Sequence, residues 1–300
     1  MLSRLLVCFA LLPFATFAQQ NFDTVKIRPF KLSENLYMLT GSGGNIGVLT
    51  GKEGVLMVDD QYAPLSEKIK QAIKALDPGD INYVINTHIH GDHTGGNENF
   101  RKSGATLVAH DNVRNRMMKE GVNRQGNKVP PRDKEAWPVV TFESKLNVHL
   151  NSEDMELVYI DKGHTDGDII VRFKNANVMH TGDAFVRGRY PIIDWSSGGS
   201  FPGFINTLDI IYILADDNTK VIPGHGALAR RQDVKDLRDK MVDIRDQVVA
   251  AMKKGTKVED IPALGIADKY DAELGRGSVK GKDFVLMVAE QMKATAELRK

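Results

Sequence analysis

The amino-acid sequence predicts a single α/β domain in which helices sandwich β-sheets, and three observations support this prediction. Short β-rich runs alternate with segments of helical periodicity along almost the whole chain. No low-complexity linker divides the chain into separate halves. The 300 residues are 42% apolar and 26% charged, a composition that can bury a substantial core and that excludes a disordered chain.

The first half of the chain predicts a β-meander followed by alternating helices and strands. Glycine clusters separate the first three β-rich runs, which is typical of turns between short strands. The helical spacing of Leu65, Ile69 and Ile73 predicts a helix that ends before a Pro-Gly pair. The expected strands are 35–40, 46–50, 55–59, 83–86 and 106–109, and the expected helices are 64–75, 97–102 and 112–120.

The second half repeats this alternation more loosely, after a segment that predicts a long loop. That segment, residues 121–138, contains three prolines and many polar side chains. The expected strands beyond it are 146–150, 155–160, 169–173, 178–181 and 220–222, and the expected helices are 204–214, 232–254 and 283–298. The last two helices are charged and amphipathic. They predict a C-terminal helical extension, about 232–300, and leave open whether it covers a cleft or forms a homodimer.

Residues 1–18 have the pattern of a secretory signal peptide. Arg4 precedes an apolar run, and Thr16 and Ala18 place small residues at the −3 and −1 positions of a cleavage site. The apolar stretch is too short to span a bilayer. Cleavage after Ala18 leaves residues 19–300 and removes Cys8, the only cysteine, and Arg4, so the net charge falls from +1 to zero. We therefore expect a periplasmic or secreted protein with no stable membrane insertion after processing.

Charge and cysteine content exclude several classes of protein. Forty Lys and Arg residues oppose 39 Asp and Glu residues, so the chain has no overall basic field that would favour nucleic acid as a partner. One cysteine excludes both a disulfide framework and a zinc site built from several cysteines. The expected partner is a small-molecule substrate.

Three histidines and one carboxylate lie within six residues, directly after the expected strand 83–86. His88 and His90 share one side of an extended segment because side chains alternate along it. Gly91 permits a bend that directs Asp92 and His93 elsewhere, as two adjacent metal ions would require. Imidazole and carboxylate ligands suit zinc, or less selectively iron or manganese. A pH-sensing or merely polar loop is the alternative interpretation.

This H-x-H-x-D-H motif resembles the signature of the metallo-β-lactamase superfamily, and further elements resemble it in the same order. They are the strand 55–59 that ends in Asp59, Gly163-His164-Thr165, Thr181-Gly182-Asp183 and Pro223-Gly224-His225-Gly226. The resemblance covers about 36–226. It implies a four-layer αββα sandwich of two mixed β-sheets, with the metals at one edge between the sheets and Asp59 in a structural role.

The resemblance also implies a ligand set and a reaction. The first metal would be held by His88, His90 and His164, the second by Asp92, His93 and His225, with Asp183 as the bridge. The expected cofactors are two Zn²⁺ per chain, with Fe or Mn as alternatives. A metal-bridging hydroxide would attack a carbonyl, and Asp92 would orient it or accept its proton.

Departures from particular subfamilies narrow the expected substrate. Asp183 stands where the cysteine-ligand β-lactamases have Cys, His88 stands where the mono-zinc ones have Asn, and His90 stands where flavodiiron oxidoreductases have Glu. The remaining chemistry is hydrolysis of an ester, thioester, lactone or β-lactam. Arg187, Arg189 and Tyr190 are candidates to hold a substrate carboxylate or polarise a carbonyl, or equally are ordinary surface and packing residues.

Several polar residues have a simpler expected role. Asp166 and Asp168 either support ligand histidines or cap the turn before the expected strand 169–173. His110, His149 and His180 are expected to be packed or surface residues. Two further functions remain open at this point: a mononuclear-iron sulfur dioxygenase on the same scaffold, and a non-catalytic metal-binding protein.

Overall fold

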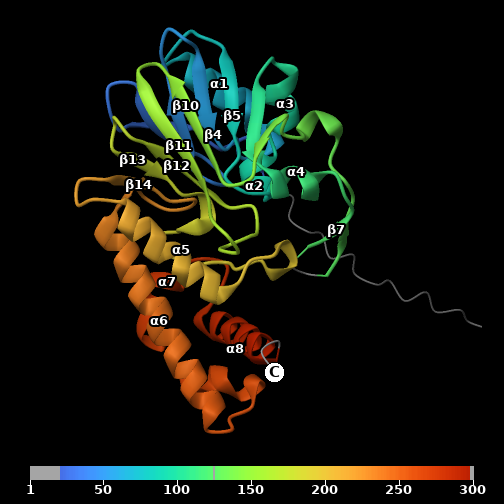
Figure 1. Cartoon of the computed structure of the whole chain (residues 1–300), viewed down its shortest axis with the longest axis vertical. Helices are drawn as coiled ribbons and strands as arrows, with labels where there is room; N and C mark the ends of the chain where they lie inside the picture. Colours follow the sequence, from blue (N-terminus) through green and yellow to red (C-terminus); the bar gives the residue numbers. More distant parts are fainter. Residues whose placement is uncertain (1–20, 124–125, 298–300) are drawn as a thin grey trace, which may run out of the picture.

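Two mixed β-sheets stack face to face, and helices cover their outer faces (Figure 1). The computed structural model describes residues 21–123 and 126–297. The predicted signal peptide, residues 1–18, lies outside the described residues. Among the described helices, none is long and apolar enough to cross a membrane.

The first sheet has seven strands in the order β1-β2-β3-β4-β5-β6-β9. Pairing is antiparallel from β1 to β4 and parallel from β4 to β9, so the carboxyl ends of β4 and β5 lie at the same edge. The strands are β1 (Arg28–Lys31), β2 (Leu36–Thr40), β3 (Ile46–Leu49), β4 (Val55–Val58), β5 (Ile81–Ile85), β6 (Thr106–His110) and β9 (Val140–Phe142).

The second sheet has six strands in the order β10-β11-β12-β13-β14-β15. Only β13 and β14 pair in parallel, and the other neighbours are antiparallel. The carboxyl ends of β11, β13 and β14 therefore share one edge. The strands are β10 (Lys145–Leu150), β11 (Glu153–Tyr159), β12 (Ile169–Phe173), β13 (Val178–His180), β14 (Lys220–Ile222) and β15 (Ala229–Arg230).

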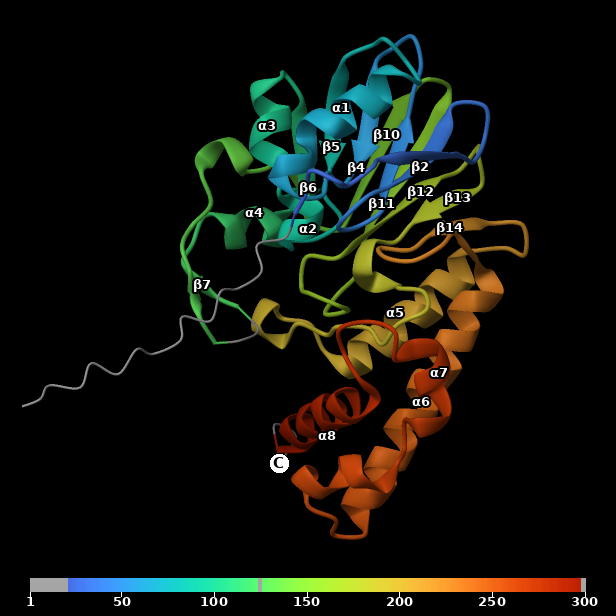
Figure 2. The ribbon, with the colours of Figure 1, turned by 180° about the vertical axis from the view of Figure 1, so that it is seen from behind.

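Helices from the first half of the chain cover the first sheet, and helices from the C-terminal part cover the second sheet (Figures 1 and 2). They are α1 (Ser66–Lys74), α2 (Gly91–Thr94), α3 (Asn97–Lys102), α4 (Asp111–Met117), α5 (Phe201–Leu214), α6 (Arg231–Lys253), α7 (Asp268–Leu274) and α8 (Gly281–Glu297). Short 3₁₀ helices lie at Ala63–Leu65, Lys134–Ala136, Gly182–Ala184, Trp195–Ser197 and Val258–Leu264.

Three apolar clusters show that the layers are helix, sheet, sheet and helix. Between the sheets, Leu56 and Ile85 of the first sheet pack with Leu157 and Val171 of the second. A second cluster joins the first sheet to α1 and α3, and a third joins the second sheet to α5, α6 and α8. Because each sheet is covered on both faces, inner strands such as β4 and β12 are nearly continuous apolar runs. The predicted αββα sandwich is confirmed.

Three strands, one hairpin and the helix α7 are additional to the expected elements. The expected loop 121–138 instead contains the hairpin of β7 (Gly121–Val122) and β8 (Lys128–Val129), and a 3₁₀ turn. Strands β1, β9 and β15 were also not expected, because they are short edge strands whose pairing, not their sequence, defines them.

The start of α5 also differs from the expected helix 204–214. The helix begins at Phe201, because the Ser200 side chain accepts a hydrogen bond from the Gly203 amide (3.1 Å) and Pro202 suits the first turn. The first turn of a helix tolerates proline since its amide needs no helical partner.

Candidate active site

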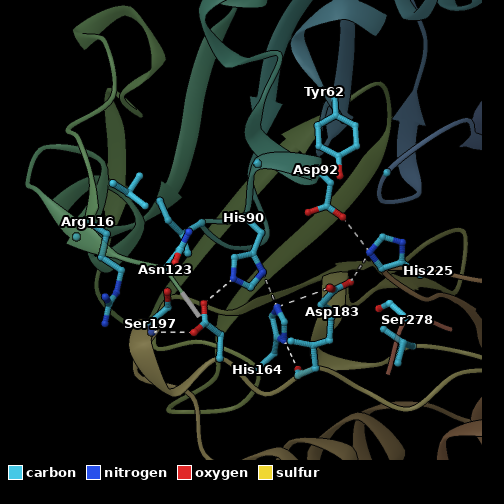
Figure 3. Close-up of a pocket in the computed structure, with 18 of the residues that line it drawn as sticks. Tyr62, His90, Asp92, Arg116, Asn123, His164, Asp183, Ser197, His225 and Ser278 are labelled. Atoms are coloured by element: carbon cyan, nitrogen blue, oxygen red, sulfur yellow. Dashed lines mark hydrogen bonds and ion pairs between the residues drawn. The ribbon is translucent and has the colours of Figure 1, made fainter. Parts of the chain in front are cut away.

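The seven candidate ligands come together at the edge where the strands of both sheets end (Figure 3). The segment after β5 and the single turn of α2 carry four of them, the β11–β12 loop carries one, and one follows each of β13 and β14. The seven residues are His88, His90, Asp92, His93, His164, Asp183 and His225. Parallel neighbours end side by side, so ligands that are far apart in the sequence meet here.

The seven side chains form two groups that could each hold a metal ion. Within each group one ligand atom per residue lies within 4.8 Å of all the others. The first group is His88, His90, His164 and Asp183, and the second is Asp92, His93 and His225. This division is the one that the resemblance implied for the two metals.

Asp183 lies between the two groups and faces both of them. Its Oδ2 is 3.6 Å from His164 Nε2 in the first group. Its Oδ1 is 3.4 Å from both His93 Nε2 and His225 Nε2 in the second. One carboxylate with an oxygen directed to each group has the geometry of a bridging ligand.

Asp59 fixes the orientation of one histidine in each group. Its Oδ2 accepts hydrogen bonds from His93 Nδ1 (2.7 Å) and from the Thr87 hydroxyl (2.7 Å). Since that hydroxyl hydrogen is donated to Asp59, the His88 Nδ1–H donates to the hydroxyl oxygen at 3.0 Å. Both imidazoles therefore direct their Nε2 atoms into the site.

The other two histidines of the first group are held in the same way, by residues that sequence reasoning missed. His90 Nε2 donates to Asp194 Oδ2 (2.8 Å), and His164 Nδ1 donates to the Ile192 carbonyl (2.5 Å). The free His90 Nδ1 and His164 Nε2 face each other at 2.8 Å. The segment after Asp183 supplied Arg187, Arg189 and Tyr190 as candidates for substrate binding, but nothing local in it indicates that Asp194 would meet His90.

Asp168 and Asp166 have separate roles in the loop that carries His164. The Asp168 carboxylate accepts from the backbone amides of His164 (2.6 Å) and Thr165, which closes the turn. Burial raises the pKa of Asp168 to about 7. Asp166 instead forms a two-point ion pair with Arg116, at 2.7 and 2.6 Å. The loop is thus fixed by its own carboxylates, whose hydrogen bonds among the described residues go to groups other than the ligand imidazoles.

Glycine is required where the backbone passes close to two ligands. A β-carbon on Gly44 would overlap the His93 ring, and one on Gly224 would overlap Asp183 Oδ1. The glycine beside His225 in the sequence is therefore a packing requirement of the carboxylate in the neighbouring loop.

The donor set fits divalent cations by chemistry and by unsatisfied atoms. His88 Nε2 and Asp183 Oδ1 are buried and have no hydrogen-bond partner among the described residues. A buried polar atom without a partner is costly unless something else binds it. Burial and the surrounding imidazoles hold the pKa of His88 well below its usual range, and they lower the pKa of His164 to about 4. These imidazoles are neutral at pH 7, as metal ligands must be.

In the absence of a cation, the histidines of the second group have raised pKa values, unlike His88 and His164 of the first group. Burial alone would lower the pKa of His225, but the Asp183 and Asp92 carboxylates raise it to about 9. Asp59 and Asp183 likewise raise the pKa of His93 against its burial. The carboxylates therefore attract positive charge here, and a metal ion would take the place of these protons.

A cavity of about 770 Å³ opens in front of both groups. Apolar side chains such as Ile89, Val129 and Ile192 form part of its wall, and Lys119, Arg132 and Arg189 also line it. Ser278, from the loop between α7 and α8, completes the wall on the His225 side (Figure 3). The C-terminal extension therefore contributes to the cleft.

The structure places the three residues proposed to bind substrate in different environments. The Arg187 guanidinium contacts Leu228 O and Asp233 (2.8 Å), and Arg187 is not among the residues that line the cavity. Tyr190 lines the cavity, but its hydroxyl donates to Asp271 (2.7 Å). Arg189 lines the cavity and has no ion-pair partner among the described residues.

The remaining histidines have packing or surface environments. His110 stacks on Tyr159, with ring centroids 3.8 Å apart, and His149 is exposed beside Asp154. His180 is buried and donates from Nε2 to the Asn45 carbonyl (3.1 Å), which ties the second sheet to the first. All three lie outside the two ligand groups.

The fold and the ligand cluster define a class of metal-dependent hydrolases, and comparison of the sequence identifies the family. The sequence model of the metallo-beta-lactamase superfamily matches residues 39–237. The chain belongs to the metallo-beta-lactamase superfamily.

Individual relatives within the superfamily are distant. A hydroxyacylglutathione hydrolase of Pelagibacter ubique is 29% identical over 160 residues, which is 52% of this chain and 57% of that protein. A type 2 metallo-beta-lactamase of Elizabethkingia meningoseptica is 25% identical over 52% of this chain and 61% of its own length. The matches thus span less than two thirds of either relative.

Two solved structures show the same fold. A metallo-beta-lactamase from Pontibacter korlensis superposes with a TM-score of 0.62 at 14% identity, covering 73% of this chain and 100% of that one. A sec-alkylsulfatase from a Pseudomonas species superposes with a TM-score of 0.68 at 16% identity, over 88% of this chain and 50% of that one.

Proposed function

We propose that this chain is an exported, binuclear zinc hydrolase that cleaves a small carbonyl substrate: an ester, thioester, lactone or β-lactam. The observation that carries the proposal is the pair of adjoining ligand groups that share Asp183. A mononuclear site would need only the first group, whereas here a second group of three ligands adjoins it. The names of the relatives, a hydroxyacylglutathione hydrolase and a metallo-beta-lactamase, agree with hydrolysis, and the cavity is wide enough to admit a small molecule.

The protein side chains would divide the work of the reaction. Two zinc ions, held by the two groups, would supply an activated water at neutral pH and an electrophile for the carbonyl. Asp92 lies 3.1 Å from His225 Nε2 and is partly exposed to the cavity, so it can orient the attacking water and accept its proton. Although burial opposes it, the neighbouring His93 and His225 lower the pKa of Asp92 to about 2, so it is ionised. Lys119, Arg132 and Arg189 would attract an anionic group on the substrate.

The proposal is tested by metal analysis followed by a substrate panel. We expect two zinc ions per chain, and turnover of at least one member of a panel of an ester, a thioester, a lactone and a β-lactam. A chelator should abolish turnover, and zinc should restore it. His225→Ala should lose the second zinc, while His149→Ala, an exposed histidine outside the site, should retain both.

Three results would contradict the proposed metal mechanism. Less than one equivalent of metal, or turnover that a chelator does not affect, would exclude a binuclear metal mechanism. One equivalent of iron with oxygen consumption on a sulfur compound would replace it by the dioxygenase.

Export is tested separately by sequencing the N-terminus of the protein recovered outside the cytoplasm. A chain that begins at Gln19 supports cleavage after Ala18, and one that begins at Met1 contradicts it.

A further inference from the structure

The segment that follows β4 is held rigidly against the ligand groups. Asp59 and Gln61 both adopt left-handed backbone conformations, with φ of 64° and 57°. The Asp60 amide donates to the His93 carbonyl (2.9 Å), and the Gln61 side chain donates to the Gly44 carbonyl (2.6 Å). Such backbone strain persists only where surrounding contacts impose it, and it concentrates at functional sites. The segment delivers the next residue, Tyr62, to the cavity wall.

The Tyr62 ring packs against another aromatic ring, whereas its hydroxyl has no hydrogen-bond partner among the described residues. Its ring packs against Phe22, with centroids 5.4 Å apart, and its hydroxyl end is directed toward the Asp92 carboxylate (Figure 3). No group among the described residues forms a hydrogen bond with this hydroxyl. Tyr190, the other tyrosine of the cavity, differs because its hydroxyl already donates to Asp271. Tyr62 is therefore a phenol whose donor is free and faces the ligand groups.

A tyrosine phenol has an ordinary pKa of about 10, so Tyr62 carries its proton at neutral pH. A phenol in this state donates a hydrogen bond and does not act as a base. Ester cleavage creates negative charge first on the carbonyl oxygen and then on the leaving oxygen. A fixed donor stabilises such charge most when water is excluded.

We propose that Tyr62 is a catalytic residue, whose phenol donates a hydrogen bond to the substrate oxygen that becomes negatively charged on the Asp92 side of the site. The proposal rests on the hydrolase function proposed above. The phenol keeps its proton throughout: the C–O bond of the tetrahedral adduct breaks, and the leaving oxygen takes its proton from the attacking water, with Asp92 as the relay. Tyr62 stabilises the charge until that transfer is complete.

The test compares Tyr62→Phe with Tyr83→Phe in the zinc-loaded, full-length protein. Tyr83 is a matched control, since it is a partly buried tyrosine of β5 whose hydroxyl also has no partner among the described residues. We expect Tyr62→Phe to lower kcat for an ester by about 100-fold, the effect of removing one oxyanion donor. KM, zinc content and the thermal midpoint should stay close to wild type. The loss should grow as the leaving group becomes more basic, which a merely structural role would not produce.

A binding measurement separates this proposal from the proposed function. A phosphonate analogue of the ester, which mimics the negatively charged adduct, should bind Tyr62→Phe about tenfold more weakly or worse, whereas the carboxylate product should bind both proteins equally. Unchanged kcat and unchanged phosphonate affinity in Tyr62→Phe would overturn the role of Tyr62 and leave the hydrolase intact. A wild-type protein without chelator-sensitive hydrolysis would instead overturn the proposed function, and the phosphonate comparison would still decide whether Tyr62 donates to an oxyanion.

Discussion

Asp59 illustrates how a residue outside the two ligand groups can organise both of them. It is fully buried, and through His93 directly and His88 by way of Thr87 it fixes one imidazole in each ligand group. Its backbone amide donates to the Ile85 carbonyl at the end of β5, so the carboxylate is positioned by the sheet itself. Partners of this kind raise the affinity of the ligands that they orient.

Asp59→Asn should weaken zinc binding by about 10- to 100-fold. The amide preserves the size of the side chain and tolerates the left-handed backbone, but its NH₂ group would face the donors of Thr87 or His93. The measurement is zinc affinity by competition with a chromophoric chelator. Asp217→Asn, at a 91% exposed surface position, is the control. Equal affinity in the two variants would contradict the role of Asp59.

His225 predicts how zinc binding depends on pH. Its pKa is raised from 6.5 to about 9 in the metal-free protein, so it must lose a proton before it can bind zinc below about pH 9. We expect zinc affinity at the second group to rise between about pH 6.5 and 9, with release of the proton of His225 and of the proton of His93. Titration calorimetry in buffers of different ionisation enthalpy measures the released protons.

The raised pKa of His225 also predicts how the stability of the metal-free protein depends on pH, and this dependence is opposite to that of zinc affinity. A raised pKa contributes folding stability that is complete below pH 6.5 and is lost as the pH rises through about 9. The free energy of unfolding of the metal-free protein should therefore fall over this range, while that of the zinc-loaded protein should not. A metal-free protein that becomes more stable over this range would contradict the assignment.

At the scale of elements, α5 shows how a local signal supports the site at a distance. Ser200 caps the helix through the Gly203 amide, and its own amide donates to Lys162 O and Gly163 O in the loop before His164. The helix then buries Phe201 and Phe204 against the second sheet. The cap therefore joins the helix to the ligand loop.

Ser200→Ala should lower the free energy of unfolding by about 1 kcal/mol, the usual value for loss of a helix cap. Ser200→Thr, which keeps the hydroxyl acceptor, should lose much less. Urea denaturation of the three proteins in the metal-free state measures the difference. An alanine variant as stable as wild type would show that the Gly203 amide is satisfied without the side chain.

At the scale of the whole molecule, the two sheets are joined at the metal edge. Asn45, directly before β3 of the first sheet, donates from its backbone amide to the Gly224 carbonyl (2.7 Å) and from its side chain to the Pro223 carbonyl (2.8 Å) in the His225 loop. Each ligand group also draws residues from both halves of the sandwich. Bound metal would therefore add cross-links to an interface that is otherwise held by apolar packing and a few hydrogen bonds.

The zinc-loaded protein, measured at zinc concentrations far above the dissociation constant, should have a thermal midpoint of unfolding at least about 5 °C higher than that of the metal-free protein. Scanning calorimetry before and after chelation measures the change, and added zinc should restore it. The His225→Ala protein should show a smaller difference because only the first group remains complete. A midpoint independent of metal would mean that the sheets do not depend on the ligand groups for their association.

Much of the fold and the ligand set follows from local sequence. Alternation and helical spacing predicted most strands and helices, and α3 and β14 were predicted with the boundaries observed. The elements missed are mainly edge strands such as β9 and the hairpin of β7 and β8, which depend on pairing partners. The spacing of His88, His90, Asp92 and His93 predicted two directions of side chains because a strand end followed by a helical turn produces them.

The sequence by itself determined the class of domain, the motif and the kinds of ligand, because these depend on backbone geometry over a few neighbouring residues. Only the tertiary structure decided which side chains orient the ligand histidines and which side chains face the cavity. Asp194 meets His90 across 104 residues, the Arg187 guanidinium pairs with Asp233, and Tyr62 lines the cavity with a hydroxyl that has no hydrogen-bond partner in the described part of the chain. Such contacts depend on how two sheets stack and where their strands end, which no short stretch of sequence specifies.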